Sequence, residues 1–312
     1  MDPKPANPTA SSPKPAGDAR RSESLAVHRA WGKRKWVVWG ILAALCVATG
    51  VVWHGSQRSP AGPADGTSIG WDINPRTGPT ATFRVATFNI HGCKGLDGRR
   101  DPTRIAQCLQ GLDLVALNEV HGHRYASPPD QAEDLGRRLG LGWLFAPAEA
   151  RWWGIDRFGN GLLTALPVRS WQRIPLVRCY DHSCRNVLLA TAECPGGTVR
   201  VLVTHLVAGE DRERQGQLRA VIALFESLAE PALLLGDLNS AGDDPHLGQL
   251  LARPGIADPL GKRRGSPGRP RIDWILTRGL RTVDAGSLDS GASDHPMFWA
   301  ELAVQGPPER LQ

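Results

Sequence analysis

The sequence predicts an α/β layered domain that follows one long apolar helix. After residue 81, short apolar runs rich in β-prone residues alternate with stretches whose apolar residues recur at helical spacing, a pattern typical of sheets covered by helices. Before that point, residues 36–53 run for eighteen positions without a charged side chain. With 312 residues and 41% hydrophobic composition, the chain is large enough to bury a sizeable core.

Residues 36–53 have the features of a transmembrane helix. Eighteen residues is the lower limit for crossing about 30 Å of hydrocarbon. Trp36, Trp39 and Trp53 lie near the ends of this run, where indole rings favour the membrane interface. The basic cluster 33–35 precedes the run, and the positive-inside rule then places the N-terminus in the cytoplasm and the chain after residue 54 outside. A cleaved signal peptide and a buried core helix are the alternatives.

The flanking segments differ in composition from the domain. Residues 1–35, rich in Pro, Ala, Ser and basic residues, are expected to form a disordered cytoplasmic arm. Residues 54–80, full of Gly, Pro, Ser and Asp, are expected to form a flexible stalk. The layered domain would then span residues 81–304 and leave 305–312 as a C-terminal tail.

Strands and helices are expected in alternation along the domain. Strands are predicted at 82–90, 112–117, 161–166, 198–206, 231–235, 271–277 and 296–303. Helices are predicted at 102–110, which follows the cap-like Asp101, at 130–140 and at 211–229.

The net charge of +6 is concentrated near the N-terminus. Residues 1–60 hold nine Lys and Arg residues against three acidic ones, so the remainder has 37 − 9 = 28 basic and 31 − 3 = 28 acidic residues. Enzymes that track nucleic-acid phosphates usually carry a basic surplus on the working domain. The charge distribution therefore does not support tight DNA binding.

The six cysteines leave two interpretations open. Cys46 lies in the apolar run, and the domain holds Cys93, Cys108, Cys179, Cys184 and Cys194. In an oxidising compartment, Cys179 with Cys184 and Cys93 with Cys108 could each close a loop. Free thiols are the alternative.

Polar residues follow nearly every predicted strand. They are Asn89, Glu119, His205, Asp237, Asn239, Asp273, Asp294 and His295. Strand ends gathered at one edge of a sheet form the usual crevice for a site. So many carboxylates together are costly unless a cation neutralises them. Oxygen ligands favour Mg²⁺, or else Mn²⁺, over Zn²⁺.

Seven short segments occur in a characteristic order. They are 87–90 (TFNI), 118–120 (NEV), 159–163 (GNGLL), 204–206 (THL), 236–239 (GDLN), 271–276 (RIDWIL) and 293–296 (SDHP). Each segment alone is common, but the ordered series resembles the endonuclease/exonuclease/phosphatase superfamily, the group of pancreatic deoxyribonuclease and the neutral sphingomyelinases. The resemblance implies a four-layer α/β (α+β) sandwich of two packed, mainly antiparallel sheets flanked by helices.

The resemblance also implies a metal site and a base. Glu119, aided by Asn89, resembles the principal metal ligand, and Asp294 resembles a supporting ligand that acts through a water or at a second metal position. Asp237 resembles the group that orients or deprotonates the attacking water. Asn239 resembles the residue that holds that water and the phosphate.

Further residues resemble phosphate-binding groups. His295 would contact the phosphate, with Asp273 fixing its tautomer and favouring its charged form. His205 resembles a second histidine that donates to a non-bridging phosphate oxygen, and Asn160 would also contact phosphate. Nuclease members carry an acid that partners this second histidine, for which Asp156 is the candidate.

Two loop segments lie near these motifs. For His121 and His123, which follow Glu119, substrate contact and plain packing are both open. Trp152 and Trp153 cannot both face one core in an extended segment, so one would stack on a substrate ring or enter the outer leaflet, unless both pack against a helix.

Together these patterns predict a membrane-anchored, Mg²⁺-dependent hydrolase of phosphate esters that acts outside the cytoplasm. A lipid head group or another small phosphodiester is the expected substrate. The alternatives are an extracellular metal-dependent nuclease, with nucleic acid as its partner, and a catalytically silent phosphate-binding module. The sequence indicates no protein partner.

Overall fold

The computed structural model describes residues 17–70, 81–176, 184–209, 211–261, 263, 265 and 268–305. The chain divides between Gly55 and Ser56 into two compact units. The first unit contains one helix, and the second unit contains every strand and the remaining helices of the described residues.

Helix α1 spans Gly17–Ser56. Its part from Lys35 to Ser56, 22 residues with a mean hydropathy of 2.0, is long and apolar enough to cross a membrane. The helix starts earlier than the predicted span, so residues 17–35 of the arm expected to be disordered are helical. Extending an existing helix adds one hydrogen bond for each residue fixed and needs no new nucleus, which favours continuation into this Ala-, Arg- and Glu-containing stretch.

The second unit is built on two mixed β-sheets. The seven-stranded sheet has the order β1 (Ser59–Pro60), β5 (Gly142–Arg151), β6 (Asp156–Thr164), β4 (Leu114–His123), β3 (Phe83–Asn89), β13 (Met297–Val304), β12 (Leu280–Leu288). The six-stranded sheet has the order β11 (Asp273–Arg278), β10 (Ala232–Asp237), β9 (Gly197–His205), β8 (Asn186–Cys194), β7 (Val168–Pro175), β2 (Ala64–Gly66). Only the β3–β4 and β9–β10 pairs of the described strands are parallel.

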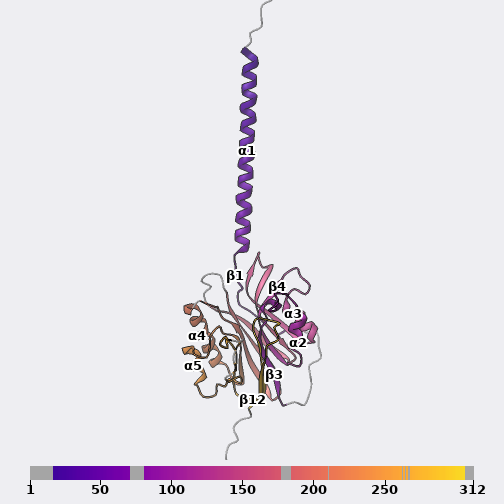
Figure 1. Cartoon of the computed structure of the whole chain (residues 1–312), viewed down its shortest axis with the longest axis vertical. Helices are drawn as coiled ribbons and strands as arrows, with labels where there is room; N and C mark the ends of the chain where they lie inside the picture. Colours follow the sequence, from indigo (N-terminus) through magenta and orange to yellow (C-terminus); the bar gives the residue numbers. More distant parts are fainter. Residues whose placement is uncertain are drawn as a thin grey trace, which may run out of the picture. The chain divides into compact units, whose positions relative to one another are not determined.

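Helices cover the outer faces of both sheets (Figure 1). Helices α2 (Pro102–Cys108) and α3 (Gln131–Leu139) pack on the seven-stranded sheet through residues such as Ile105 and Leu135. Helices α4 (Asp211–Ser227) and α5 (Pro245–Leu251) cover the six-stranded sheet through Leu218, Phe225 and Leu247. The predicted four-layer sandwich is therefore confirmed.

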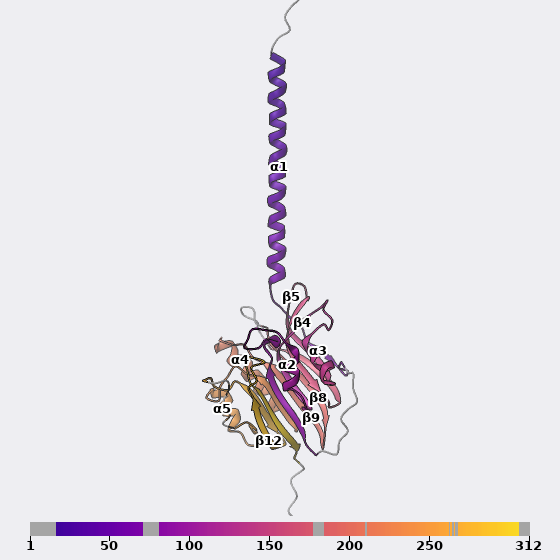
Figure 2. The same cartoon turned by 45° about the vertical axis from the view of Figure 1, so that its right-hand side comes forward.

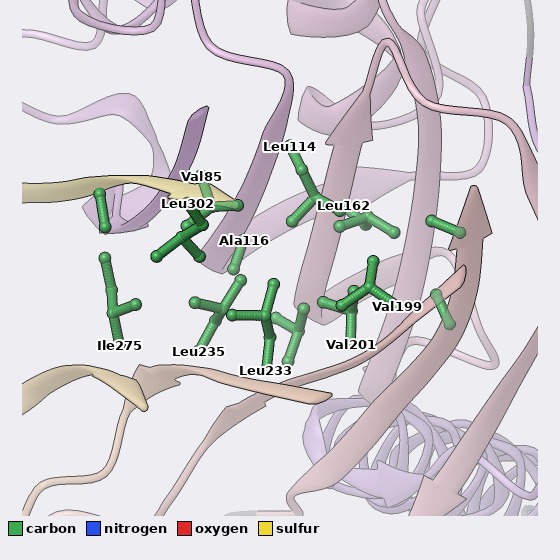
Figure 3. Packing of buried hydrophobic residues seen from close by; sticks show 14 of the residues in the cluster. Val85, Leu114, Ala116, Leu162, Val199, Val201, Leu233, Leu235, Ile275 and Leu302 are labelled. Carbon is green, nitrogen blue, oxygen red and sulfur yellow. The ribbon is translucent and has the colours of Figure 1, made fainter. Parts of the chain in front are cut away.

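The central core lies between the two sheets. Figure 3 shows Val85 and Leu114 from one sheet meeting Leu233, Leu235 and Ile275 from the other, all fully buried. Strands covered on both faces often read as continuous apolar runs, which is why sequence patterns find most of the central strands, but the inner strands β5 and β8 are not predicted. Outer strands such as β7 and β12 carry exposed polar residues and are not predicted.

Residues 59–70 differ from the flexible stalk expected there. Ser59–Pro60 pair with β5, Ala64–Gly66 pair with β7, and Gly70 forms a bridge with Trp143. The edge strands of the two sheets would otherwise present unpaired N–H and C=O groups, and these short segments bind them. The expected stalk residues 71–80 lie outside the described residues.

The structure tests one of the two disulfide bridges that the sequence leaves open. Cys93 and Cys108 are free thiols, so no disulfide joins them. Burial raises the pKa of the Cys93 thiol to about 12, as expected for an unreactive core cysteine. The Cys179–Cys184 bridge cannot be followed, because Cys179 lies outside the described residues.

Gly236 generates a prediction for stability. Its φ of 140° lies in a region that side chains rarely adopt, and a Cβ there would collide with the carbonyl oxygen of Thr204 on the neighbouring strand. We expect Gly236→Ala to lower the free energy of unfolding by about 3 kcal/mol. Urea denaturation followed by tryptophan fluorescence measures this change.

The matched control is Gly242→Ala. The added methyl group would meet Trp274 at 3.6 Å, an ordinary contact distance, so the loss should stay below about 1 kcal/mol. Equal losses in the two variants would contradict the steric explanation.

Candidate active site

Strand register gathers polar side chains at one edge of both sheets. In the parallel β9–β10 pair Asp237 lies opposite His205, and in the antiparallel β10–β11 pair it lies opposite Asp273. In the other sheet Asn89 lies opposite Asn118. Residues directly opposite one another project to the same face. The neighbours of Asp237 are thus fixed by backbone pairing.

Four predicted residues form a compact, mostly buried cluster. His295 Nδ1 lies 2.8 Å from Asp273 Oδ2, and His295 Nε2 lies 3.9 Å from Asp237 Oδ2. His205 Nε2 lies 3.6 Å from the same Asp237 oxygen. Ligand atoms of Asp237, Asp273 and His295 all lie within 4.8 Å of one another, which is close enough to share a metal ion.

Asn239 is held beside this cluster by a turn. Its backbone N–H donates to Asp237 Oδ1 over 2.8 Å, and its Nδ2 donates to the carbonyl of Leu206 over 2.8 Å. Its φ of 47° is left-handed, a conformation that Asn tolerates better than most residues. The Asp-Leu-Asn sequence thus forms an Asx turn that also orients the Asp237 carboxylate.

The predicted metal ligands surround the cluster. Asn89 Nδ2 donates to Glu119 Oε1 and to Asp237 Oδ2, each over 3.2 Å, and so connects the two carboxylates. Glu119 sits at a bulge of β4 with a left-handed φ of 57°. Asp294 is 43% exposed, and its Oδ1 lies 3.3 Å from Nδ1 of His91, a contact that no sequence pattern predicts.

The environment separates the protonation states of the cluster. Burial and the nearby Asp273 carboxylate raise the pKa of Asp237 to about 7. Burial alone would lower the pKa of His295, but the hydrogen bond to Asp273 and the charges of Asp273, Asp237 and Asp294 raise it to about 9. For His205, burial and the charges of Arg185 and His295 keep the pKa well below its usual range. His205 therefore stands as a neutral imidazole beside Asp237.

The donor set fits a hard divalent cation. Asp273 Oδ1 and His205 Nδ1 are buried and have no hydrogen-bond partner among the described residues. Two charged groups, His295 and Arg185, face a larger number of carboxylates. These are Glu119, Asp237, Asp273 and Asp294. Two further positive charges would balance this set, and carboxylate and amide oxygens are the ligands that Mg²⁺ and Mn²⁺ prefer.

Arg185 is a functional candidate that the sequence patterns do not predict. Its Nε is buried without a hydrogen-bond partner among the described residues, and its guanidinium lies 5.6 Å from the centroid of the Phe158 ring. Burial lowers the pKa of Arg185, whereas Glu149, Glu119 and Asp237 raise it. The available signal was an arginine directly before the apolar strand 186–194, where a buried cation needs an anionic partner.

Three buried asparagines link the sheets beneath the cluster. Asn118 Nδ2 donates to Asn160 Oδ1 over 2.8 Å, and Asn160 Nδ2 donates to Asn186 Oδ1 over 2.9 Å. Asn118 Oδ1 accepts from the backbone N–H of Asp237 over 2.9 Å. Both ends of the Asn160 amide are thus bound within the protein, and the predicted phosphate contact of Asn160 stays a prediction.

A cavity of about 510 Å³ opens beside the cluster. The extension of β4, the hairpin β5–β6 and the loop before α3 line it with residues such as His121, Arg151 and Phe158, and Arg100 from the loop before α2 also lines it. The Phe158 ring joins cavity and cluster, because its centroid lies 5.3 Å from that of His121 and 6.4 Å from that of His205.

Asp156 takes a different partner from the predicted one. Its Oδ1 lies 3.7 Å from His123 Nε2, and both groups line the cavity. His205 Nδ1 has no hydrogen-bond partner among the described residues. The expected Asp156–His205 pair is therefore wrong. Register explains this, since Asp156 pairs with His123 at the far end of the β4–β6 ladder.

The raised pKa of His295 generates a prediction. In the metal-free protein its folded-state pKa of about 9 lies above the ordinary value of 6.5. The protonated His295 therefore adds about 3 kcal/mol to the free energy of unfolding. This contribution is fully present below pH 6.5 and is lost as the pH rises through 9. Asp273→Asn should lower the pKa toward 6.5, measured by NMR titration of the imidazole in EDTA.

Glu193→Gln is the control for this titration. Glu193 is an exposed carboxylate paired with Arg169 and should leave the His295 titration unchanged. An unaltered His295 pKa in Asp273→Asn would show that another group holds its proton.

Comparisons with known proteins agree with this fold. The family model described as "Endonuclease/Exonuclease/phosphatase family" matches residues 86–295. A solved endonuclease/exonuclease/phosphatase from Beutenbergia cavernae shares 25% identity and a TM-score of 0.60, covering 73% of each chain. A Bacteroides vulgatus structure of the same description shares 17% identity and a TM-score of 0.59, covering 72% of this chain and 99% of the other.

A third similar structure is D. rerio TDP2 complexed with a single-strand DNA product, at 18% identity and a TM-score of 0.55, covering 72% of this chain and 100% of the other. Comparison with curated proteins gave no significant match. The family model spans more than half of the chain and includes every residue of the cluster. The chain belongs to the endonuclease/exonuclease/phosphatase family.

Proposed function

We propose that the protein is a Mg²⁺-dependent hydrolase of a small phosphodiester, such as a lipid head group, anchored by α1 with its domain outside the cytoplasm. Members of this family act on phosphodiester bonds. The observation that carries the proposal is the cluster around Asp237. There a carboxyl group with a pKa of about 7 lies 3.9 Å from a histidine held in its charged form.

The residues divide the work of an in-line displacement. Asp237, oriented by Asn239, accepts the proton of the water that attacks phosphorus. As the bond between phosphorus and the alcohol oxygen breaks, that oxygen leaves and takes up a proton from solvent water. His295, held by Asp273, and the neutral His205 donate hydrogen bonds to the phosphate oxygens. A Mg²⁺ ion, held by Glu119, Asn89 and Asp294, would supply positive charge opposite the developing negative charge.

Arg185 supplies the remaining positive charge. The partly buried Arg185 side chain interacts electrostatically with the carboxylates of Glu149, Glu119 and Asp237. A phosphate between these groups and the histidines would meet donors on several sides. We infer that Arg185 stabilises the charge on the phosphate oxygens.

The cavity and the charge balance favour a small substrate. A volume of about 510 Å³ suits a head group or a single nucleotide-sized alcohol rather than a duplex. With 28 basic and 28 acidic residues beyond residue 60, the chain lacks the surplus of a phosphate-tracking enzyme.

A metal-dependent nuclease is the second candidate function. TDP2, with the same fold, binds a single-strand DNA product, and Arg100, Arg151 and Arg157 around the cavity could meet a nucleic-acid phosphate. His205 Nδ1 has no acidic partner among the described residues, although its Nε2 lies 3.6 Å from Asp237 Oδ2, and this weighs against the nuclease branch.

Metal removal and two substitutions test the reaction class. The full chain in detergent should hydrolyse bis-p-nitrophenyl phosphate, lose activity in EDTA and recover it with Mg²⁺. Asp237→Asn and His295→Ala should each lower kcat about 1,000-fold, because one removes the base and the other a charge on the phosphate. Glu193→Gln, outside the cluster, should keep full activity.

The same protein separates the candidate functions. Chelator-sensitive turnover of phospholipid vesicles without DNA cleavage supports the proposal, and the reverse result supports the nuclease. No turnover of any ester with Mg²⁺ or Mn²⁺ would identify a phosphate-binding module. A loss below tenfold in both variants would refute the assigned roles.

A fusion experiment tests the topology. Alkaline phosphatase joined after Gln312 in a bacterial host should be active, and green fluorescent protein at the same place should stay dark, because the domain is expected outside the cytoplasm. Deletion of residues 36–53 serves as the control and should reverse both signals. A fluorescent, phosphatase-negative intact chain would overturn the proposed orientation.

A further inference from the structure

The turn between β5 and β6 holds two strained tryptophans. Trp152 and Trp153 both have left-handed backbones, with φ of 51° and 55°. Such a conformation costs roughly 1–2 kcal/mol for each bulky residue. Their rings meet edge to face with centroids 6.2 Å apart, and Trp153 is 61% exposed. The strained turn therefore holds the Trp153 indole at the surface, with the partly buried Trp152 ring beside it.

A second exposed aromatic residue lies on the adjoining loop. The backbone N–H of Arg124 donates to the carbonyl of Ile155 over 2.8 Å, which ties that loop to the tryptophan turn. The next residue, Tyr125, is 73% exposed. Arg124 and Arg151 are exposed as well. We call Arg124, Tyr125, Arg151, Trp152 and Trp153 the aromatic rim.

The aromatic rim borders the mouth of the cavity. Residues 149–151 and 156–158 of the hairpin line the cavity, and the tryptophan turn joins these two segments. The ends of β4 and β5 lie together at one end of the domain (Figures 1 and 2). A surface that contacts the rim would thus lie next to the cavity.

The chain enters the domain at the same place. Ser59 pairs with Ala150 and Pro60 with Glu149, and Arg58 Nη1 forms an ion pair of 2.9 Å with Glu149. Ala150 precedes Trp152 by two residues. The apolar helix ends at Ser56, three residues before Ser59, and this distance is at most about 10 Å of extended chain.

We propose that the aromatic rim is a second membrane contact, which inserts into the head-group region of the leaflet where α1 ends. The inference rests on the proposed anchor. Indole and phenol rings favour the membrane interface, and arginines beside them attract anionic lipid phosphates. Because the tether already confines the rim near the leaflet, even a weak insertion would be populated. The contact would hold the cavity mouth against the lipid head groups.

Fluorescence quenching tests the contact without any requirement for catalysis. In the full chain with Cys46, Cys108, Cys179 and Cys194 replaced by Ser, Trp153→Cys is labelled with a polarity-sensitive fluorophore and reconstituted into nanodiscs that contain zwitterionic and anionic lipids. Leu288→Cys, on the exposed outer strand β12, is the matched control. Lipids spin-labelled near the head group should quench the probe at 153 several-fold more than the probe at 288. Equal quenching would overturn the proposal.

A kinetic comparison distinguishes lipid contact from substrate stacking. Trp152→Ser with Trp153→Ser should lower the turnover of a vesicle-embedded phosphodiester about tenfold and leave that of soluble bis-p-nitrophenyl phosphate unchanged. Leu288→Ser should change neither rate. An equal loss on both substrates would refute membrane contact and indicate stacking on the substrate. If the parent chain hydrolyses no ester, the proposed function fails, and the quenching result still decides whether the rim enters the bilayer.

Discussion

The buried amide of Asn118 fixes the two sheets relative to each other at the site. It accepts from the N–H of Asp237 over 2.9 Å and donates to the carbonyl of Thr204 over 3.0 Å. The acids come from different sheets, Glu119 from one and Asp237 from the other. Core packing alone is non-directional, whereas an unpaired buried amide costs about 1–3 kcal/mol, so this hydrogen bonding selects one alignment of the sheets. The spacing between Glu119 and the cluster around Asp237 depends on that alignment.

The cluster around Asp237 holds more negative than positive charge, and the fold of the backbone causes this imbalance. Backbone register forces Asp237 and Asp273 together, and burial denies them water. The positive charge of His295 neutralises part of this negative charge. The loop that carries His295 is fixed because Ser293 Oγ donates to the carbonyl of Asn89 over 2.7 Å. This arrangement lowers the stability of the fold but creates a strong electrostatic field at the place where a phosphate and a cation would enter.

The sequence predicts the layers and the residues that converge, because strand-end polar groups such as His205 and Asp237 are positioned by local pattern and pairing. It does not predict the partners of Asn160 or the place of Arg185, since these depend on contacts between segments far apart in the chain. The edge pairing of residues 59–70 escapes prediction for the same reason. A stretch rich in Gly and Pro has no pattern of its own, and its conformation is decided by the open strand edges it meets.

The residues that follow the apolar helix, 59–60 and 64–66, are paired with edge strands of the domain. One short strand closes the seven-stranded sheet and the other closes the six-stranded sheet. A protease that cuts just after the apolar helix would shed a domain in which residues 59–66 still cover the outer edges of β5 and β7. A cut after Gly70 would instead leave the covering strands held by non-covalent contacts alone, and their loss would expose β5 and β7 as unpaired edge strands. The position of the cut would therefore decide between release of the folded domain and self-association through its exposed edges.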